Sequence, residues 1–129
     1  MIVVDSSVWI AHFRNDATPQ VAKLRSLQNP NDVIVGDLVL LECLQGARDD
    51  AHAARIEAAL RAFQLEEMLD ASLAAEAARN YRRLRAIGLT PRKTIDVIIG
   101  TYCIVNSHQL LHQDSDFDAL EKHLGLRVL

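Results

Sequence analysis

Short apolar runs alternate with longer amphipathic stretches along this chain. Short runs rich in Val, Ile and Leu are typical of buried strands, and apolar positions spaced three or four apart are typical of helices. The pattern predicts strands at residues 2–5, 33–35, 109–112 and 126–129, with residues 64–69 as a further candidate. It predicts helices at residues 8–13, 19–28, 38–47, 51–63, 72–88, 95–107 and 117–125.

The predicted strands are apolar on both faces, and helices separate them. Strands of this kind belong to parallel sheets that helices cover on both sides. The sequence therefore predicts an α/β fold with three layers, α/β/α, around a central, mainly parallel sheet of four to five short strands.

Capping residues mark the ends of several predicted helices. Thr18 followed by Pro19 is a typical helix start, and Gly88 suits the left-handed position after a helix end. The other expected starts are Asp37, Asp49 or Asp50, Ser72 and Thr94.

Composition favours one folded domain, residues 1–129, because half of the 129 residues are hydrophobic. No apolar run reaches the ~20 residues that span a membrane, and the N-terminus lacks a signal-peptide pattern, so we expect a cytoplasmic protein without a membrane partner. Cys43 and Cys103 lack metal-binding spacing and are expected to be reduced core thiols.

Acidic residues follow two of the predicted strands. Asp5 comes directly after the first apolar run, and Asp114 and Asp116 follow the run at residues 109–112. In parallel sheets, ligands bind beyond the carboxyl ends of the strands. Each acid also has a structural alternative, because Asp5 could cap a helix and the other two could form a turn.

Two further acids lie in helices that are otherwise apolar. Glu42 is part of the segment LLECLQG, and Asp96 lies in the first turn of TIDVIIGTYCIV. Glu42 could reach solvent from the edge of a buried face, and Asp96 could stabilise the helix start through the helix dipole. Taken together the acids indicate a metal site, because clustered carboxylates repel one another unless a cation bridges them, and oxygen ligands select Mg²⁺ or Mn²⁺.

Four segments in this order resemble those of the PIN-domain ribonucleases, and within them the VapC toxins of bacterial toxin–antitoxin pairs. The likeness covers the whole chain and is carried by VVDSSVWI, LLECLQG, TIDVIIG and LLHQDSDFDAL. The PIN fold has the same alternation of strands and helices as the one predicted above. A phosphatase of the haloacid dehalogenase type would need D-x-D after the first strand, where this chain has Asp5-Ser6-Ser7.

The resemblance implies a role for each matching residue. The acidic quartet that carries catalysis would be Asp5, Glu42, Asp96 and Asp114. The metal ligands would come from Asp5, Asp96, Asp114 and Asp116, with Mg²⁺ as the cofactor and Mn²⁺ as a second candidate. Ser7 would hold a carboxylate or a water molecule in place, although it could also be an ordinary helix-start serine.

A basic segment, residues 79–93, precedes Asp96. The net charge of the chain is −3, but the five acids of the proposed metal site account for more than that. The residues expected to contact RNA phosphates are Arg82, Arg85, Arg92 and Lys93. The alternative is a solvated helix face; Tyr81 is expected in the core, and no histidine pairs with another at metal-ligand spacing.

The implied function is a metal-dependent endoribonuclease toxin that hydrolyses structured RNA, such as transfer or ribosomal RNA, and is neutralised by a VapB-like antitoxin. VapC-like proteins are usually dimers, and we expect residues 37–63 to supply partner surfaces. The alternative is a non-catalytic PIN-like module that binds RNA or protein. The presence of all four acids favours the enzyme.

Overall fold

The computed structural model describes all 129 residues and contains five strands in one sheet, ordered β3-β2-β1-β4-β5 and parallel throughout. The strands are β1 (Ile2–Val4), β2 (Val33–Gly36), β3 (Gln64–Glu66), β4 (Gln109–Leu111) and β5 (Arg127–Val128). The predicted α/β fold and its parallel sheet are confirmed, including the additional strand at residues 64–66.

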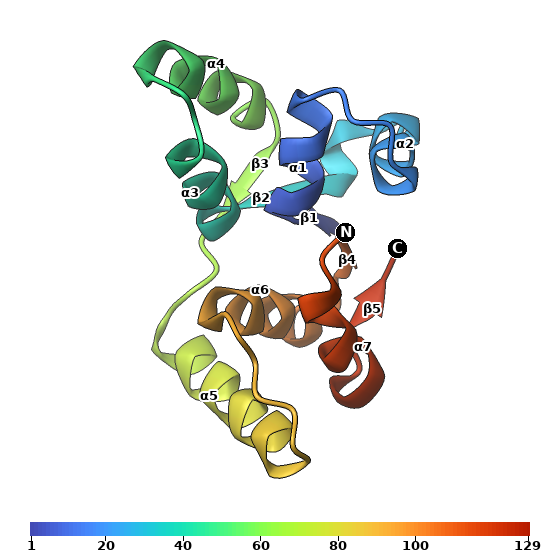
Figure 1. Ribbon diagram of the computed structural model, residues 1–129, viewed down its shortest axis with the longest axis vertical. Helices are drawn as coiled ribbons and strands as arrows, with labels where there is room; N and C mark the ends of the chain where they lie inside the picture. Colours follow the sequence, from blue (N-terminus) through green and yellow to red (C-terminus); the bar gives the residue numbers. More distant parts are fainter.

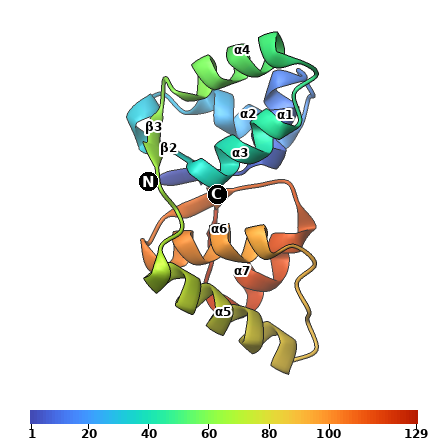
Figure 2. The same cartoon turned by 90° about the vertical axis from the view of Figure 1, so that its left-hand side faces the viewer.

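Helices cover both faces of the sheet, as predicted (Figures 1 and 2). One layer holds α1 (Ser6–Phe13), α2 (Pro19–Ser26), α3 (Asp37–Gln45) and α4 (Asp50–Leu60). The opposite layer holds α5 (Ala71–Ala86), α6 (Thr94–Val105) and α7 (Asp118–Leu124). Two 3₁₀ turns, η1 (Pro30–Asp32) and η2 (Ser115–Phe117), precede β2 and α7. None of the helices is long and apolar enough to cross a membrane.

The sheet order reverses beside β1. From β1 the chain passes to β2 and then to the β3 edge, whereas β4 pairs with the other side of β1 and leads to the opposite edge. Val3, Val4, Leu110 and Leu111 are fully buried, so these two central strands are enclosed on both faces. Ligands of open parallel sheets bind where the order reverses, beyond the carboxyl ends of such strands.

Most of the predicted helix ends are confirmed. The Thr18 hydroxyl accepts from the Val21 amide, with Pro19 as the first residue of α2. Asp49 caps α4 by accepting from the amide of His52. Gly88 has a positive φ of 83°, and the amides of Gly88 and Leu89 donate to carbonyls in the last turn of α5.

Two predicted caps are wrong. Asp70, not Ser72, caps α5, because its carboxylate accepts from the Leu73 amide while Ser72 already lies inside the helix. Gly36 is the cap residue of α3, and Asp37 is the first helical residue. The Asp37 carboxylate instead accepts from the Leu38 and Met68 amides, which ties α3 to the segment after β3.

Tyr81 does not lie in the core, contrary to the prediction. It is half-buried, lies beneath the Arg85 guanidinium at 6.0 Å, and lines a groove between α5 and α6. Cys43 and Cys103 are free and buried, as expected, and burial raises the pKa of each thiol to about 12.

Candidate active site

Asp5 continues β1 and begins α1. Its amide donates to the Leu111 carbonyl at 2.9 Å, which fixes it beside the end of β4. Its Oδ2 accepts from the amide of Ser7 at 3.0 Å and from the Ser7 hydroxyl at 2.6 Å. Its Oδ1 is buried and has no hydrogen-bond partner. Asp5 therefore caps α1 with one oxygen and leaves the other free for a ligand.

Ser7 links the ends of the two central strands. Its hydroxyl donates to Asp5 and accepts from the Gln113 amide at 3.2 Å. Ser7 thus orients a carboxylate, the arrangement that the resemblance implied. No sequence pattern singled out its neighbour Ser6. Ser6 is nevertheless only 7% exposed, and its hydroxyl donates to Glu42 Oε1 at 3.0 Å. The adjacent serines thereby hold two acids that are far apart in the chain, Asp5 directly after β1 and Glu42 in α3.

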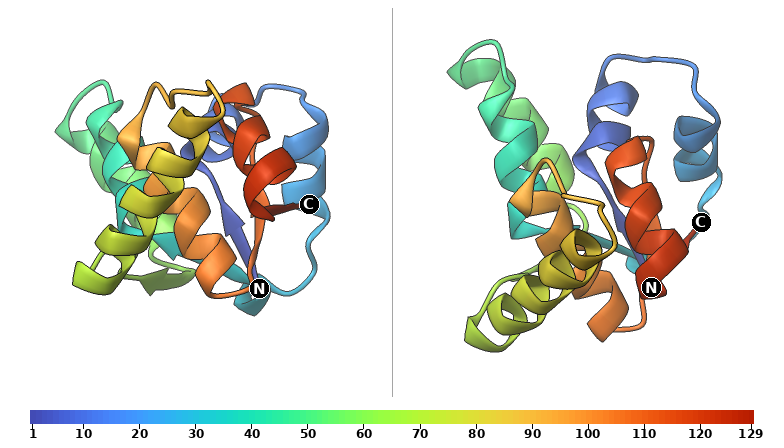
Figure 3. Two further views of the ribbon diagram at one scale, coloured as in Figure 1. Left: turned by 90° about the horizontal axis from the view of Figure 1, so that it is seen from below. Right: turned by 60° about the horizontal axis from the view of Figure 1, so that its bottom comes forward.

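Three more acids converge from the opposite layer. Asp96 lies in the first turn of α6 and is 4% exposed. Asp114 follows β4, and its Oδ1 accepts from the Asp116 amide at 2.9 Å. One carboxylate oxygen each from Asp96, Asp114 and Asp116 can be chosen so that all three lie within 4.8 Å of one another. Figure 3 shows the α5–α6 connection and the start of α7 at the same end of the molecule.

Burial and mutual repulsion raise the pKa of three of these carboxyls. The pKa of Asp5 is raised by burial, against the hydrogen bonds from Ser7. The pKa of Glu42 is raised by burial and by the charge of Asp5. Burial, together with the charges of Asp5 and Asp114, raises the pKa of Asp96 to about 6, despite the nearby Lys93. These effects place Asp5, Glu42, Asp96 and Asp114 in one electrostatic cluster.

Asp114 titrates in the opposite direction. Burial acts to raise its pKa, but the amide of Asp116 and the ammonium of Lys93 outweigh burial, and the net pKa is lowered. Asp114 therefore stays ionised at neutral pH, while the raised pKa values of Asp5, Glu42 and Asp96 favour their protonated forms more than usual.

The raised pKa of Asp96 predicts a pH-dependent effect of Asp96→Asn on stability. A carboxyl whose folded pKa lies above its ordinary value of 3.8 takes up protons on folding, so its contribution to the free energy of unfolding falls as pH rises from about 4 to about 6. The side-chain amide of the Asn variant does not titrate, so the variant does not lose this stability as pH rises. In EDTA it should be more stable than the wild type by about 2 kcal/mol at pH 7 and by much less at pH 4. Urea unfolding across this range measures the difference, and a pH-independent difference would contradict the assignment.

The basic residues expected to contact RNA lie in two places. Lys93 and Arg92 reach back to the acids, with Lys93 Nζ 2.9 Å from Asp114 Oδ2 and Arg92 Nη2 3.0 Å from Asp116 Oδ1. Arg82 and Arg85 are exposed on α5, where they line the groove between α5 and α6. The sequence placed all four in one basic segment and gave no sign that two of them pair with the acids.

Asp5, Glu42, Asp96, Asp114 and Asp116 together form what we call the acidic cluster. Its oxygen ligands fit a hard divalent cation. Besides Asp5 Oδ1, the oxygens Asp96 Oδ2 and Asp116 Oδ2 are buried without hydrogen-bond partners. Asp5 Oδ1 has no partner at all, and Asp96 Oδ2 and Asp116 Oδ2 have only the Lys93 ammonium, at 3.4 and 3.6 Å. Buried polar atoms in proteins are normally satisfied, so these carboxylates would gain from a further positive ligand. Oxygen-only ligands of negative charge suit Mg²⁺ or Mn²⁺.

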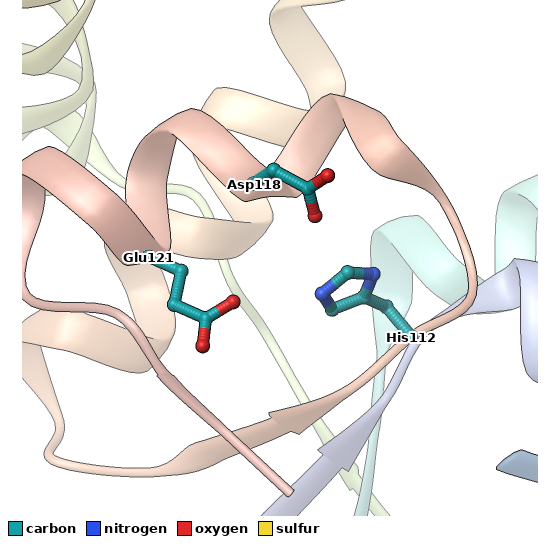
Figure 4. A group of neighbouring side chains, drawn as sticks. All are labelled: His112, Asp118 and Glu121. Carbon is teal, nitrogen blue, oxygen red and sulfur yellow. The ribbon is translucent and has the colours of Figure 1, made fainter.

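A second group of potential ligands lies beside the first. His112, at the end of β4, faces Asp118 and Glu121 of α7 (Figure 4). No sequence pattern had connected these residues. His112 Nδ1 accepts from the Asp114 amide at 3.2 Å, so the proton of the neutral ring lies on Nε2. Nε2, which is buried without a partner, thus offers a donor to the two carboxylates and no lone pair for a metal.

Comparison with known proteins identifies the family. The family model described as "PIN domain" matches residues 2–123. The chain belongs to the PIN-domain family. The parallel sheet, the acids at its carboxyl edge and the order of the four segments agree with this membership, and the resemblance stated from the sequence is confirmed.

Named relatives of this PIN domain include ribonucleases. Ribonuclease VapC11 of Mycobacterium tuberculosis strain H37Rv is 27% identical over 130 residues, covering 99% of this chain and 97% of the relative. VapC ribonuclease Mb1587 of Mycobacterium bovis matches to the same extent, with 27% identity and the same coverage of 99% and 97%.

Solved structures share the fold across almost the whole chain. VapBC2 from Rickettsia felis, bound to a promoter DNA fragment, has a TM-score of 0.80 at 14% identity and covers 100% of this chain and 98% of that one. VapC20 of Mycobacterium tuberculosis, described as a toxin that cleaves the sarcin–ricin loop, has a TM-score of 0.70 at 22% identity, with coverage of 92% and 94%. These structures show that the PIN fold of this chain is that of VapC toxins.

Proposed function

We propose that this PIN domain is a metal-dependent endoribonuclease toxin that hydrolyses phosphodiester bonds in structured cellular RNA and is neutralised by a cognate VapB-like antitoxin. The observation that carries the proposal is the convergence of Asp96, Asp114 and Asp116 on one another where the sheet order reverses, beside Asp5, whose buried Oδ1 has no partner. The names of the relatives, which are ribonucleases, support the same reaction.

We assign the acids different roles in hydrolysis. Asp5, Asp96, Asp114 and Asp116 would hold Mg²⁺, which when bound stabilises the charge that develops on the phosphate and lowers the pKa of water. Ser7 keeps Asp5 in position through its hydroxyl. Glu42, which Ser6 orients and whose pKa is raised, would take the proton from the attacking water.

The toxin proposal predicts growth arrest. Expression of the chain alone should stop growth, and co-expression with the product of an adjacent small gene should restore it, because toxins of this class are held inactive by their antitoxins. The solved relatives include toxin–antitoxin complexes from Klebsiella pneumoniae and Rickettsia felis, which supports a partner of this kind. Growth and co-purification measure the outcome. Unimpaired growth on strong expression of folded protein would contradict the proposal.

Partner contacts are proposed for the face built by α1, α3 and α4. Leu41 of α3 is a large apolar side chain that is 53% exposed. A pocket between these helices is lined by Ile10, Phe13, Cys43 and Ile56. These features support the expectation that residues 37–63 contact the antitoxin or a second copy of the chain.

A further prediction concerns the basic residues proposed to contact RNA. In the Asp5→Asn background, which prevents cleavage, the double variant Arg92→Ala, Lys93→Ala should bind RNA less tightly and with a weaker salt dependence. The slope of log K against log salt should fall by about 0.7 to 1.4, since each lost phosphate contact removes about 0.7 for single-stranded RNA. Binding measured at several salt concentrations in the presence of metal gives the slope.

The control for this prediction is the double variant Arg61→Ala, Arg127→Ala. It removes the same charge from positions outside the basic segment and the acidic cluster, and should leave the slope unchanged. An unchanged slope in the Arg92, Lys93 variant would mean that RNA follows another path, such as the groove lined by Arg82 and Arg85.

A further inference from the structure

Lys93 forms ion pairs with three acids of the acidic cluster. It precedes α6, and its Nζ lies 2.9 Å from Asp114 Oδ2, 3.4 Å from Asp96 Oδ2 and 3.6 Å from Asp116 Oδ2. These are the three acids whose oxygens lie within 4.8 Å of one another. A single ammonium group thus contacts all three carboxylates of the group that would hold a divalent cation.

We propose that Lys93 is the counter-cation of the metal-free site and that it leaves the carboxylates when a divalent cation binds. This inference rests on the proposed function, because it assigns a role to Lys93 at the same metal site.

The ammonium and a divalent cation compete for the same oxygens. Lys93 Nζ contacts Asp114 Oδ2, Asp96 Oδ2 and Asp116 Oδ2, and carboxylate oxygens of this kind are the ligands that Mg²⁺ would take. Two positive groups so close would also repel strongly. The cation would therefore bind these oxygens at the expense of their ion pairs with Lys93.

The side chain of Lys93 has a route out of the cluster. It is 48% exposed, whereas the side chains of Asp96 and Asp116 are 6% and 14% exposed. Its flexible four-carbon stem lets the ammonium move to solvent without a change in α6. Arg92 differs, because it contacts only Asp116 Oδ1, is 78% exposed and leaves Asp116 Oδ2 free.

Two consequences follow from this exchange. In the metal-free protein Lys93 offsets the repulsion among Asp96, Asp114 and Asp116, at the expense of metal affinity. Once metal is bound, the same ammonium is released at the rim of the site, where the phosphate of an RNA substrate would approach. Metal binding thereby prepares a phosphate contact.

The first test compares the Mn²⁺ affinity of variants by isothermal titration calorimetry. Lys93→Met keeps the aliphatic stem and removes the competing ammonium, so its affinity should rise by at least about tenfold over the wild type. Arg92→Met, which removes a nearby charge that does not occupy the site, should give a clearly smaller rise, and Lys122→Met on α7 should give none. An affinity for Lys93→Met that is no higher than that of Arg92→Met would overturn the proposal.

The second test uses the wild-type chain and does not depend on the folding of a variant. Lysines are acetylated with a brief pulse of reagent in EDTA and in saturating Mn²⁺, and the peptides are quantified by mass spectrometry. Lys93 should react several-fold faster with Mn²⁺, because ion pairs with three carboxylates stabilise the ammonium and leave little of the free amine that attacks the reagent. The other two lysines, Lys23 and Lys122, should react equally in both conditions and serve as internal controls.

The outcomes separate this inference from the proposed function. If calorimetry detects no Mn²⁺ binding to the wild type, both are overturned. If Mn²⁺ binds while the acetylation rate of Lys93 stays the same, the exchange is overturned and the metal-dependent nuclease stands.

Discussion

Asp96→Asn and Asp5→Asn should each reduce RNA cleavage by at least about 100-fold and abolish growth arrest. Each variant keeps the shape of the side chain but removes a negative ligand, and the loss of about 3 kcal/mol of transition-state stabilisation corresponds to this factor. In Asp5→Asn the oxygen of the new side-chain amide can still cap α1, so the local fold should persist. Cleavage rates of purified protein and growth on induction measure the effect.

Asp118→Asn is the matched control for these variants. It makes the same change of charge beside the same strand end, but Asp118 belongs to the group around His112, which lacks a free ligand nitrogen. It should retain cleavage within a few-fold of the wild type. Folded Asp96→Asn and Asp5→Asn variants that remain toxic would rule out the acidic cluster as the catalytic centre.

Removal of the divalent cation should have an effect of similar size. EDTA should stop cleavage, and added Mg²⁺ or Mn²⁺ should restore it. An ion bound only by the native state stabilises it, by about 2.7 kcal/mol at a concentration 100 times the dissociation constant, which for a chain of this length raises the melting temperature by roughly 10 °C.

The Asp96→Asn variant provides the control for the thermal measurement. It should show a much smaller rise in melting temperature with Mn²⁺, since one of the buried ligand oxygens has become an amide. Full activity after thorough chelation, or an equal rise in both proteins, would contradict a metal at this site.

The sequence was sufficient to predict the layers of the fold and to single out acids that the structure brings together. Short runs such as Ile2–Val4 have no polar face, so only a sheet covered on both sides accommodates them. Asp5 and Asp114 follow strands that turned out to be neighbours, and Glu42 and Asp96 lie in helices that offer an acid little solvent. An acid in such a position lowers the stability of the fold, because burial of a charge costs free energy. The position of the acid in the sequence therefore indicates a function even before the distances between the acids are known.

Contacts between segments far apart in the chain were not predictable from local pattern. Asp37 matches the pattern of a helix cap, yet its carboxylate also binds the Met68 amide 31 residues away. Tyr81 has the spacing of a core residue, but α6 leaves a groove beside it instead of covering it.

The ion pairs of Lys93 were likewise not predictable from local pattern. Lys93 has the pattern of a solvated basic segment, and only the approach of η2 and Asp114 to the start of α6 brings it into the acidic cluster. Ser6 was overlooked because a serine after a strand is common in helix starts, and its partner Glu42 lies 36 residues away.

The most direct test of the central claim is to sequence new RNA 5′ ends after purified protein has been incubated with total RNA. Three samples are compared: wild type with Mn²⁺, wild type with EDTA, and Asp96→Asn with Mn²⁺. A metal-dependent endoribonuclease at this cluster predicts a small set of discrete new 5′ ends in the first sample and none in the other two. The same ends in all three samples, or no new ends with folded, metal-loaded wild type, would contradict it.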